Sequence, residues 1–326
     1  MAKFLVVGGA GYIGSHMMKQ LVLEGSQAVA FDNLSTGHAD AVVYGDLLRG
    51  DLANRSMIQS VLREGQFDGV FHFASSIEVS ESVANPRKYY SNNVINTLNL
   101  IHVMMDEGID NLIFSSTAAV YGTPKAIPIT EQSEIRPVNA YGRTKAIIES
   151  ILMDYRLAYG FRSTSLRYFN AAGADMDGEM GERHEPESHL IPIAIEVALG
   201  LRREIHIFGT GHGTEDGTCV RDFIHVSDLC SAHSLAMSRL RSGDKGSSYN
   251  LGNGCGFSVR EIISTVQSVS GINFPIVEAA ARDGDPAHLV ADSTLAKEEL
   301  CWSPRVSEIE KIVESAWKFK LNRSSN

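Results

Sequence analysis

Short apolar runs alternate with helical stripes along the first half of the chain. Nearly continuous apolar runs, which are typical of parallel strands covered on both faces, occur at 4–7, 28–31, 69–73, 112–114 and 164–168. Between the first two runs, Ile13, Met17 and Leu21 form an apolar stripe at helical spacing. Repeated strand–helix–strand units predict an α/β fold built on a doubly wound parallel sheet.

The second half is less regular. Helical patterns occupy 141–152, 190–199, 259–269 and 309–319, and two polar or glycine-rich stretches, 175–189 and 209–218, predict long loops. One hydrophobic core rarely grows beyond about 250–300 residues. The 326 residues therefore predict two parts, 1–170 and 171–326, with the boundary near Asn170 and some later segments returning to the first part.

Composition narrows the class of protein. The formal net charge of -10 argues against a protein that neutralises nucleic-acid phosphates. Four separated cysteines without a C-x-x-C motif argue against a disulfide framework or a thiolate zinc site. No apolar run approaches the length of a membrane span, and no secretory leader is evident. We expect a cytoplasmic protein that binds neither nucleic acid nor membrane.

A glycine loop follows the first predicted strand. Gly8, Gly11 and Gly14 have the spacing G-x-x-G-x-x-G and open the first helix. In dinucleotide-binding folds, such glycines permit a tight turn, backbone approach to a pyrophosphate and close helix packing. The second strand ends at Asp32, where a carboxylate can accept both ribose hydroxyls of NAD and would oppose the extra phosphate of NADP. The loop predicts NAD binding.

A tyrosine and a lysine supply candidate acid–base chemistry. Tyr141 and Lys145 are four residues apart on a predicted helix, so they share a face. A nearby ammonium is expected to lower the phenol pKa, which makes Tyr141 a base for an alcohol proton. A second such pair, Tyr121 and Lys125, encloses Pro124, so a helix there is not expected.

A third element of this chemistry is a run of hydroxyls. Ser115, Ser116 and Thr117 end the strand at 112–114. In open α/β sheets, ligands bind at the carboxyl ends of the strands. A hydroxyl at this position can bridge Tyr141 and a substrate.

Ordered motifs across essentially the whole chain resemble a known family. They are GGAGYIGSH from position 8, FDNLSTG from 31, HFA from 72, FSSTAAVYG from 114, YGRTK from 141, LRYFNAAGA from 166, TEDGTCVRDFIHVSDL from 214, YNLGNG from 249 and RDGD from 282. The set resembles the extended short-chain dehydrogenase/reductases, and within them the UDP-galactose (UDP-glucose) 4-epimerases.

This resemblance implies an NAD-binding Rossmann domain followed by a smaller α/β domain that mainly binds the UDP-sugar. NAD stays bound, and Tyr141, helped by Lys145 and Thr117, removes the O4 proton while C4 is oxidised. The 4-keto sugar then turns and is reduced on its other face, which requires a strong anchor at the UDP. A homodimer is expected from the family.

The resemblance also assigns binding residues. Those expected to bind NAD are Gly8, Gly11, Tyr12, Ile13, Gly14, Asp32, Asn33, Asp51, Leu52, Phe73, Ala74, Asn92, Ser115, Tyr141, Lys145 and Tyr168. Those expected to bind the UDP-sugar are Thr117, Tyr141, Phe169, Asn170, His189, Leu190, Phe208, Arg221, Arg282, Asp285 and Leu289. The arginines suit phosphate recognition, although surface salt bridges with Asp222 or Asp285 are the alternative.

The chain departs from the family at several positions. Ile77 replaces a lysine that contacts cofactor phosphate, Thr117 a frequent serine, His189 an asparagine beside the sugar, and Phe223 a tyrosine. Leu289 lies where a bulky tyrosine excludes N-acetyl sugars and smaller residues admit them. Leucine is intermediate, so activity on UDP-N-acetylhexosamines stays open.

Other functions are less well supported. Nucleotide-sugar 4,6-dehydratases carry an Asp-Glu pair after the catalytic threonine, where this chain has Ala118 and Ala119. An epimerase of UDP-uronic acids stays open, and a non-catalytic NAD-bound scaffold is disfavoured because Tyr141 and Lys145 are both present. The Glu and His residues of 181–189 match no compact ligand spacing, so a solvated loop is predicted and no metal is expected.

Overall fold

The computed structural model describes residues 1–282 and 285–324. Its larger part is built on a seven-stranded sheet in the order β10-β6-β5-β4-β1-β2-β3, and every pair in it is parallel. The strands are β1 (Lys3–Val7), β2 (Gln27–Asp32), β3 (Asp46–Arg49), β4 (Gly69–His72), β5 (Asn111–Thr117), β6 (Arg162–Tyr168) and β10 (Ser248–Leu251). The predicted parallel sheet and its five predicted strands are confirmed.

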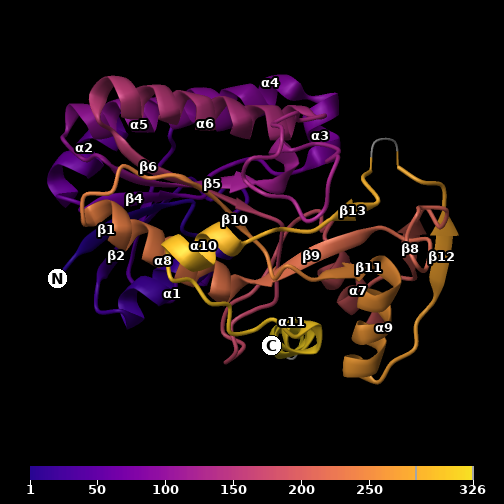
Figure 1. The fold of residues 1–326 in the computed structure, drawn as a ribbon. Coiled ribbons are helices and arrows are strands. Elements are labelled where there is room, and N and C mark those ends of the chain that lie inside the picture. The colour runs from indigo at the N-terminus through magenta and orange to yellow at the C-terminus, as the bar shows by residue number, and fades with distance from the viewer. Residues whose placement is uncertain (283–284, 325–326) are drawn as a thin grey trace.

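Helices cover both faces of this sheet (Figure 1). On one face lie α1 (Tyr12–Leu23), α8 (Val226–Arg241) and α10 (Thr294–Glu299), whose apolar side chains share a core with the sheet. On the other lie α2 (Arg55–Gly65), α5 (Asn96–Asp106) and α6 (Ala140–Tyr159). The predicted stripe on α1 is confirmed, since Met17 and Leu21 are buried in the first of these cores.

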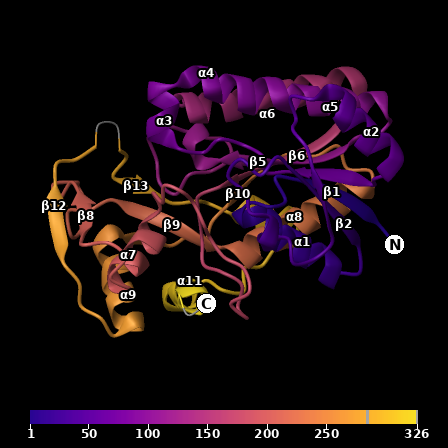
Figure 2. The same ribbon diagram turned by 180° about the vertical axis from the view of Figure 1, so that it is seen from behind.

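The smaller part has a core of its own (Figure 2). In it, β9 (Val220–His225) pairs with β7 (Asn170–Ala172), β11 (Gly256–Ser258) and β13 (His288–Leu289), while β8 (Ile205–Phe208) pairs with β12 (Ile276–Ala279). Helices α7 (Leu190–Ala198), α9 (Val259–Ser270) and α11 (Ile309–Ser324) pack with these strands. The predicted helices of the second half are therefore present.

The chain crosses between the two parts more than once. Helix α8 packs against α1, and β10 pairs with β6, although both follow strands of the smaller part. The division at residue 170 stays a prediction. No helix within residues 1–282 and 285–324 is long and apolar enough to cross a membrane.

Sheet topology indicates where a ligand can bind. Strand β1 pairs with β2 on one side and with β4 on the other. The strands before and after this change of direction are therefore added to opposite sides of β1. At such a switch point the loops after neighbouring strands separate and leave a crevice at the carboxyl ends of the strands. The glycine loop follows β1 at this point.

Candidate active site

The glycine loop between β1 and α1 is packed so closely that side chains would not fit. Gly8 has φ +81°, and a Cβ there would lie 2.6 Å from the Ala74 nitrogen. A Cβ on Gly14 would lie 2.0 Å from the Gly8 carbonyl oxygen. The tight turn and the close helix packing expected of the first and third glycines are confirmed, and Phe73 and Ala74 lie directly beside the loop.

Asp32 ends β2 beside this loop. Its carboxylate accepts hydrogen bonds from the backbone nitrogens of Ala10 (3.0 Å) and Leu34 (2.8 Å), which fixes its orientation. Each oxygen retains a further lone pair with which it can accept a ribose hydroxyl. The Asn33 amide donates to Asp51 (2.8 Å), which places these two predicted NAD contacts together.

The predicted catalytic lysine is buried at the centre of the site. Asn139 caps α6 by accepting a hydrogen bond from the Gly142 nitrogen (2.8 Å), and Lys145 lies one turn into the helix. Its ammonium donates to the Ser75 hydroxyl (2.8 Å) and to the Ser115 carbonyl oxygen (2.7 Å). Burial lowers the pKa of Lys145 to about 7, partly opposed by the charge of Glu149. Lysine here can therefore exchange its proton near neutral pH.

Tyr141 differs from the sequence expectation. Burial raises the pKa of its phenol above the usual value, and a hydrogen bond with Thr117 opposes this only in part. Lys145 bonds to Ser75 and Ser115, so it is not the group that sets the phenol pKa here. The prediction that Lys145 lowers the Tyr141 pKa is wrong for this structure, because burial raises that pKa and the group that opposes the rise is Thr117, not Lys145.

The hydroxyl run at the end of β5 has three different roles. Thr117 bonds to Tyr141 and also accepts a hydrogen bond from the Ala119 nitrogen (3.1 Å). The Ser115 hydroxyl bonds to the Tyr168 hydroxyl, and Ser116 donates to Glu149. The structure thus brings together Ser115, Thr117 and Tyr168 from β5 and β6.

Two residues of the site were missed by sequence reasoning. Ser75 accepts the Lys145 hydrogen bond, and Glu149 pairs with Arg167 at a nitrogen–oxygen distance of 2.5 Å. Ser75 lies just after β4, much as Ser115–Thr117 lie at the end of β5. A second hydroxyl after a central strand was therefore the sequence signal that could have identified Ser75. Nearby, Asn92 donates to Ser76 (3.3 Å) from the segment Tyr90–Ile95, which forms a π-helical turn of the kind that recurs at functional sites.

The second tyrosine–lysine pair is not a functional unit. Tyr121 is buried and donates to Asn250 (2.7 Å), while Lys125 is exposed and pairs with Glu134 (2.9 Å). The expected absence of a helix around Pro124 is confirmed.

On the side of the smaller part, the two arginines predicted to bind the UDP have different partners. Arg221 of β9 pairs with Asp285 at 2.5 Å, which is one of the two salt bridges considered above. The other does not form: Asp222 is buried and accepts hydrogen bonds from the backbone nitrogens of Asn253 (2.8 Å) and Gly254 (3.0 Å). The Arg282 guanidinium lies 4.0 Å from the centre of the Phe208 ring.

The predicted sugar contacts surround the end of β5 and the start of α7. Phe169 and Leu289 pack against Val120 and Tyr121, and Asn170 of β7 lies opposite Phe223 of β9. His189 precedes α7 as its N-cap residue and Leu190 begins the helix.

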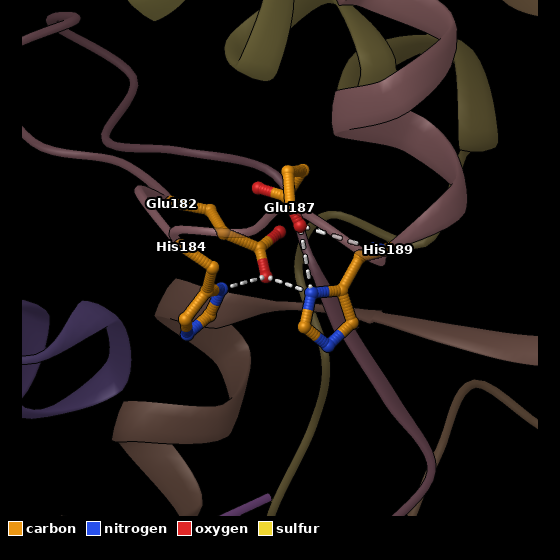
Figure 3. Close-up of side chains that lie close together, drawn as sticks. All are labelled: Glu182, His184, Glu187 and His189. Atoms are coloured by element: carbon orange, nitrogen blue, oxygen red, sulfur yellow. Dashed lines mark hydrogen bonds and ion pairs between the residues drawn. The ribbon is translucent and has the colours of Figure 1, made fainter. Parts of the chain in front are cut away.

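The segment 181–189 is not the solvated loop that its composition predicts. Glu182 and Glu187 are buried, and both carboxylates lie within 3.0 Å of His189 Nδ1 (Figure 3). Burial acts to raise the pKa of Glu182, but the charges and hydrogen bonds of His189 and His184 prevail and lower it to about 2. The prediction is wrong because other segments of the chain cover these carboxylates.

Comparison with known proteins identifies relatives over the full length. Residues 4–252 match the model of the NAD dependent epimerase/dehydratase family. The UDP-glucose 4-epimerase of Rhizobium meliloti (strain 1021) is 48% identical over 320 residues, 98% of this chain and 97% of the relative.

Two solved structures share the fold. UDP-glucose 4-epimerase from Brucella ovis in complex with NAD has 45% identity and a TM-score of 0.95, over 97% of this chain and 98% of that one. The UDP-Glc/GlcNAc 4-epimerase from Campylobacter jejuni has 40% identity and a TM-score of 0.87, over 99% and 100% of the two chains.

Proposed function

Since the chain belongs to the NAD dependent epimerase/dehydratase family, we propose that it is an isomerase that interconverts UDP-glucose and UDP-galactose at C4 of the sugar, with NAD as its cofactor. The observation that carries this proposal is the hydrogen bond between Tyr141 and Thr117 at the carboxyl end of β5, with buried Lys145 donating to the Ser115 carbonyl oxygen of the same strand. Relatives named UDP-glucose 4-epimerase match nearly the whole chain at up to 48% identity.

The described residues fit NAD. The glycine loop leaves no room for side chains where a pyrophosphate approaches, Asp32 keeps free lone pairs, and Lys145 presents a buried ammonium. Bound NAD supplies a hydride acceptor and donor for C4 and, in its oxidised form, a positive charge that favours the Tyr141 phenolate. Ile77 stands where the family resemblance expects a lysine contact with the cofactor phosphate, so the backbone nitrogens at the start of α1 are left to carry that contact.

Tyr141 is the base for the sugar O4 proton, and Thr117 orients its hydroxyl through the hydrogen bond between them. Lys145 has a pKa of about 7, so it can hold or release a proton near neutral pH within the site. The 4-keto sugar must rotate between the two half-reactions. While the sugar rotates, Arg221 and Arg282 bind the UDP, which is remote from the reacting C4 atom.

The direct test is turnover by the purified chain with no NAD added. UDP-galactose and UDP-N-acetylgalactosamine are supplied in parallel, and products are separated by ion-pair chromatography. Formation of UDP-glucose supports both the reaction and a retained cofactor. Turnover only after NAD addition supports the reaction with a weaker cofactor site, and no turnover of UDP-galactose with NAD present contradicts the proposal.

We also propose a homodimer formed through helices of the larger part. Ile95 lies just before α5, and Ile147, Met153 and Leu157 lie on α6; all four are exposed. Figure 1 shows these helices on the outer side of the sheet, away from the smaller part. Light scattering during gel filtration distinguishes a dimer from a monomer, and Leu157→Glu is expected to shift the population toward monomer.

A further inference from the structure

Four side chains with metal-binding chemistry converge in the segment that leads into α7. Glu182, His184, Glu187 and His189 each place one ligand atom within 4.8 Å of those of the other three. Figure 3 shows the two carboxylates and the two imidazole rings pointing toward one another. We propose that this His₂Glu₂ cluster binds a divalent transition-metal ion of the zinc class.

The distances suit a four-coordinate ion. His184 Nδ1 lies 3.0 Å and His189 Nδ1 lies 2.9 Å from Glu182 Oε1, and His189 Nδ1 lies 3.0 Å from Glu187 Oε1. Metal–ligand bonds of about 2.0–2.2 Å in a tetrahedron separate the ligand atoms by about 3.3–3.6 Å. The three close pairs would need to move apart by a few tenths of an ångström to accept an ion, and all four ligand atoms already lie within 4.8 Å of one another.

Glu187 Oε1 accepts hydrogen bonds from the backbone nitrogens of Ser188 and His189, but hydrogen bonds leave other atoms of the cluster unsatisfied. Nδ1 of His189 carries at most one proton, yet it lies within 3.0 Å of two carboxylate oxygens. Glu187 Oε2 is buried without a hydrogen-bond partner, although the Glu187 side chain is only 2% exposed. A cation instead uses a lone pair from every member of the cluster and neutralises two carboxylates that burial would otherwise penalise.

The surroundings favour a structural ion with access from solvent. Glu182 and Glu187 are buried, whereas the His184 and His189 side chains are 21% and 36% exposed and leave a route for entry. Arg183, between two of the ligands, turns away and pairs with Asp40 at 2.8 Å. Imidazole and carboxylate ligands without thiolate suit zinc and its neighbours in the first transition series.

Such an ion would fix the entry to α7, because His189 is the N-cap residue of that helix. The Ser188 hydroxyl, between the last two ligands, also donates to Glu78 (2.8 Å) and ties the segment to the larger part. The site would therefore clamp the loop, and because His189 is also a predicted contact of the UDP-sugar, metal binding is tested separately from turnover.

Competition titration tests the proposal. The full chain is treated with EDTA, dialysed and titrated with Zn²⁺ against a chromophoric chelator. We expect one ion per chain, about 10- to 100-fold weaker binding for His184→Asn, and a higher melting temperature with Zn²⁺ for the wild type but not for His184→Asn. The matched control is His206→Asn, which removes a half-exposed histidine 3.2 Å from Glu204 and should retain wild-type affinity.

Zinc-edge X-ray absorption on the loaded wild type gives a test that needs no variant. Coordination by nitrogen and oxygen only, with imidazole scattering, supports the cluster. A sulfur ligand would place the ion elsewhere, for example at Cys219 and His212, whose Sγ and Nε2 are 3.3 Å apart. That result, the absence of stoichiometric binding by the wild type, or equal affinity of wild type and His184→Asn would each overturn the proposal.

Discussion

Burial alone stabilises the protonated form of Tyr141, which we propose as the catalytic base. Replacing it removes the proposed base while keeping the ring. For Tyr141→Phe we expect kcat for UDP-galactose to fall about 100- to 10,000-fold with NAD content unchanged. The control is Tyr159→Phe, an exposed tyrosine on the same helix, which should keep its activity. Comparable turnover by the two variants would refute a catalytic role for Tyr141.

Buried histidine gives the molecule an acid-sensitive residue. Burial lowers the pKa of His233 to about 4, against a weaker effect of its hydrogen bond to Leu229. The unfolded chain takes up this proton near pH 6.5 and the folded chain only near pH 4, so stability is lost as the pH falls through that window. Between pH 7 and 5 the wild type should lose about 2 kcal/mol more than His233→Leu.

Urea unfolding at the two pH values measures this difference. His206→Leu, at a half-exposed histidine, should follow the wild type. An equal loss in wild type and His233→Leu would show that His233 is protonated in the folded state.

Leu289 bears on substrate choice, since it packs, as Phe169 does, against Val120 and Tyr121 at the predicted sugar site. Leu289→Tyr adds bulk there. We expect turnover of UDP-N-acetylgalactosamine to fall at least about tenfold relative to UDP-galactose. The ratio of kcat/KM for the two sugars is the readout, with Ile276→Tyr, on the exposed side of β12, as the control. An unchanged ratio would mean that Leu289 does not border the C2 substituent.

At the scale of elements, the strand–glycine loop–helix unit depends on contacts that admit no Cβ. Gly14→Ala places a methyl group against the Gly8 carbonyl, so it should lower the free energy of unfolding by about 1–3 kcal/mol and reduce the NAD content. Gly211→Ala, where a Cβ meets nothing within 4 Å, should change stability by less than about 0.5 kcal/mol. Urea unfolding and NAD content of both variants check this, and equal effects would contradict the packing argument.

Elements differed in how well the sequence predicted them. The central strands and α1 were predictable because continuous apolar runs and helical stripes arise from burial within the element itself. The place of β10 was not, since this four-residue edge strand pairs with β6 about 80 residues earlier in the chain. Local pattern carries no information about which distant segment an edge strand joins.

At the scale of the whole molecule, sequence motifs identified part of the candidate site. The features that depend on tertiary packing, such as burial and pKa direction, were missed. The glycine loop lies at the expected switch point beside β1, and Thr117, which bonds to Tyr141, ends β5 two strands away. The direction of the Tyr141 pKa and the burial of Glu182 and Glu187 were not predictable, because they depend on what other segments cover. The composition of a segment can be read from its own residues, but its exposure depends on which other segments pack over it.

The central claim is that C4 loses and regains the same hydride through tightly held NAD. It is tested most directly by converting UDP-galactose in D₂O with the purified chain and no added NAD, followed by proton NMR of the product. Return of the hydride from NAD leaves UDP-glucose with its proton at C4, and this is the expected product. Deuterium at C4 would show that the carbon exchanges a proton with solvent, and would contradict the hydride mechanism.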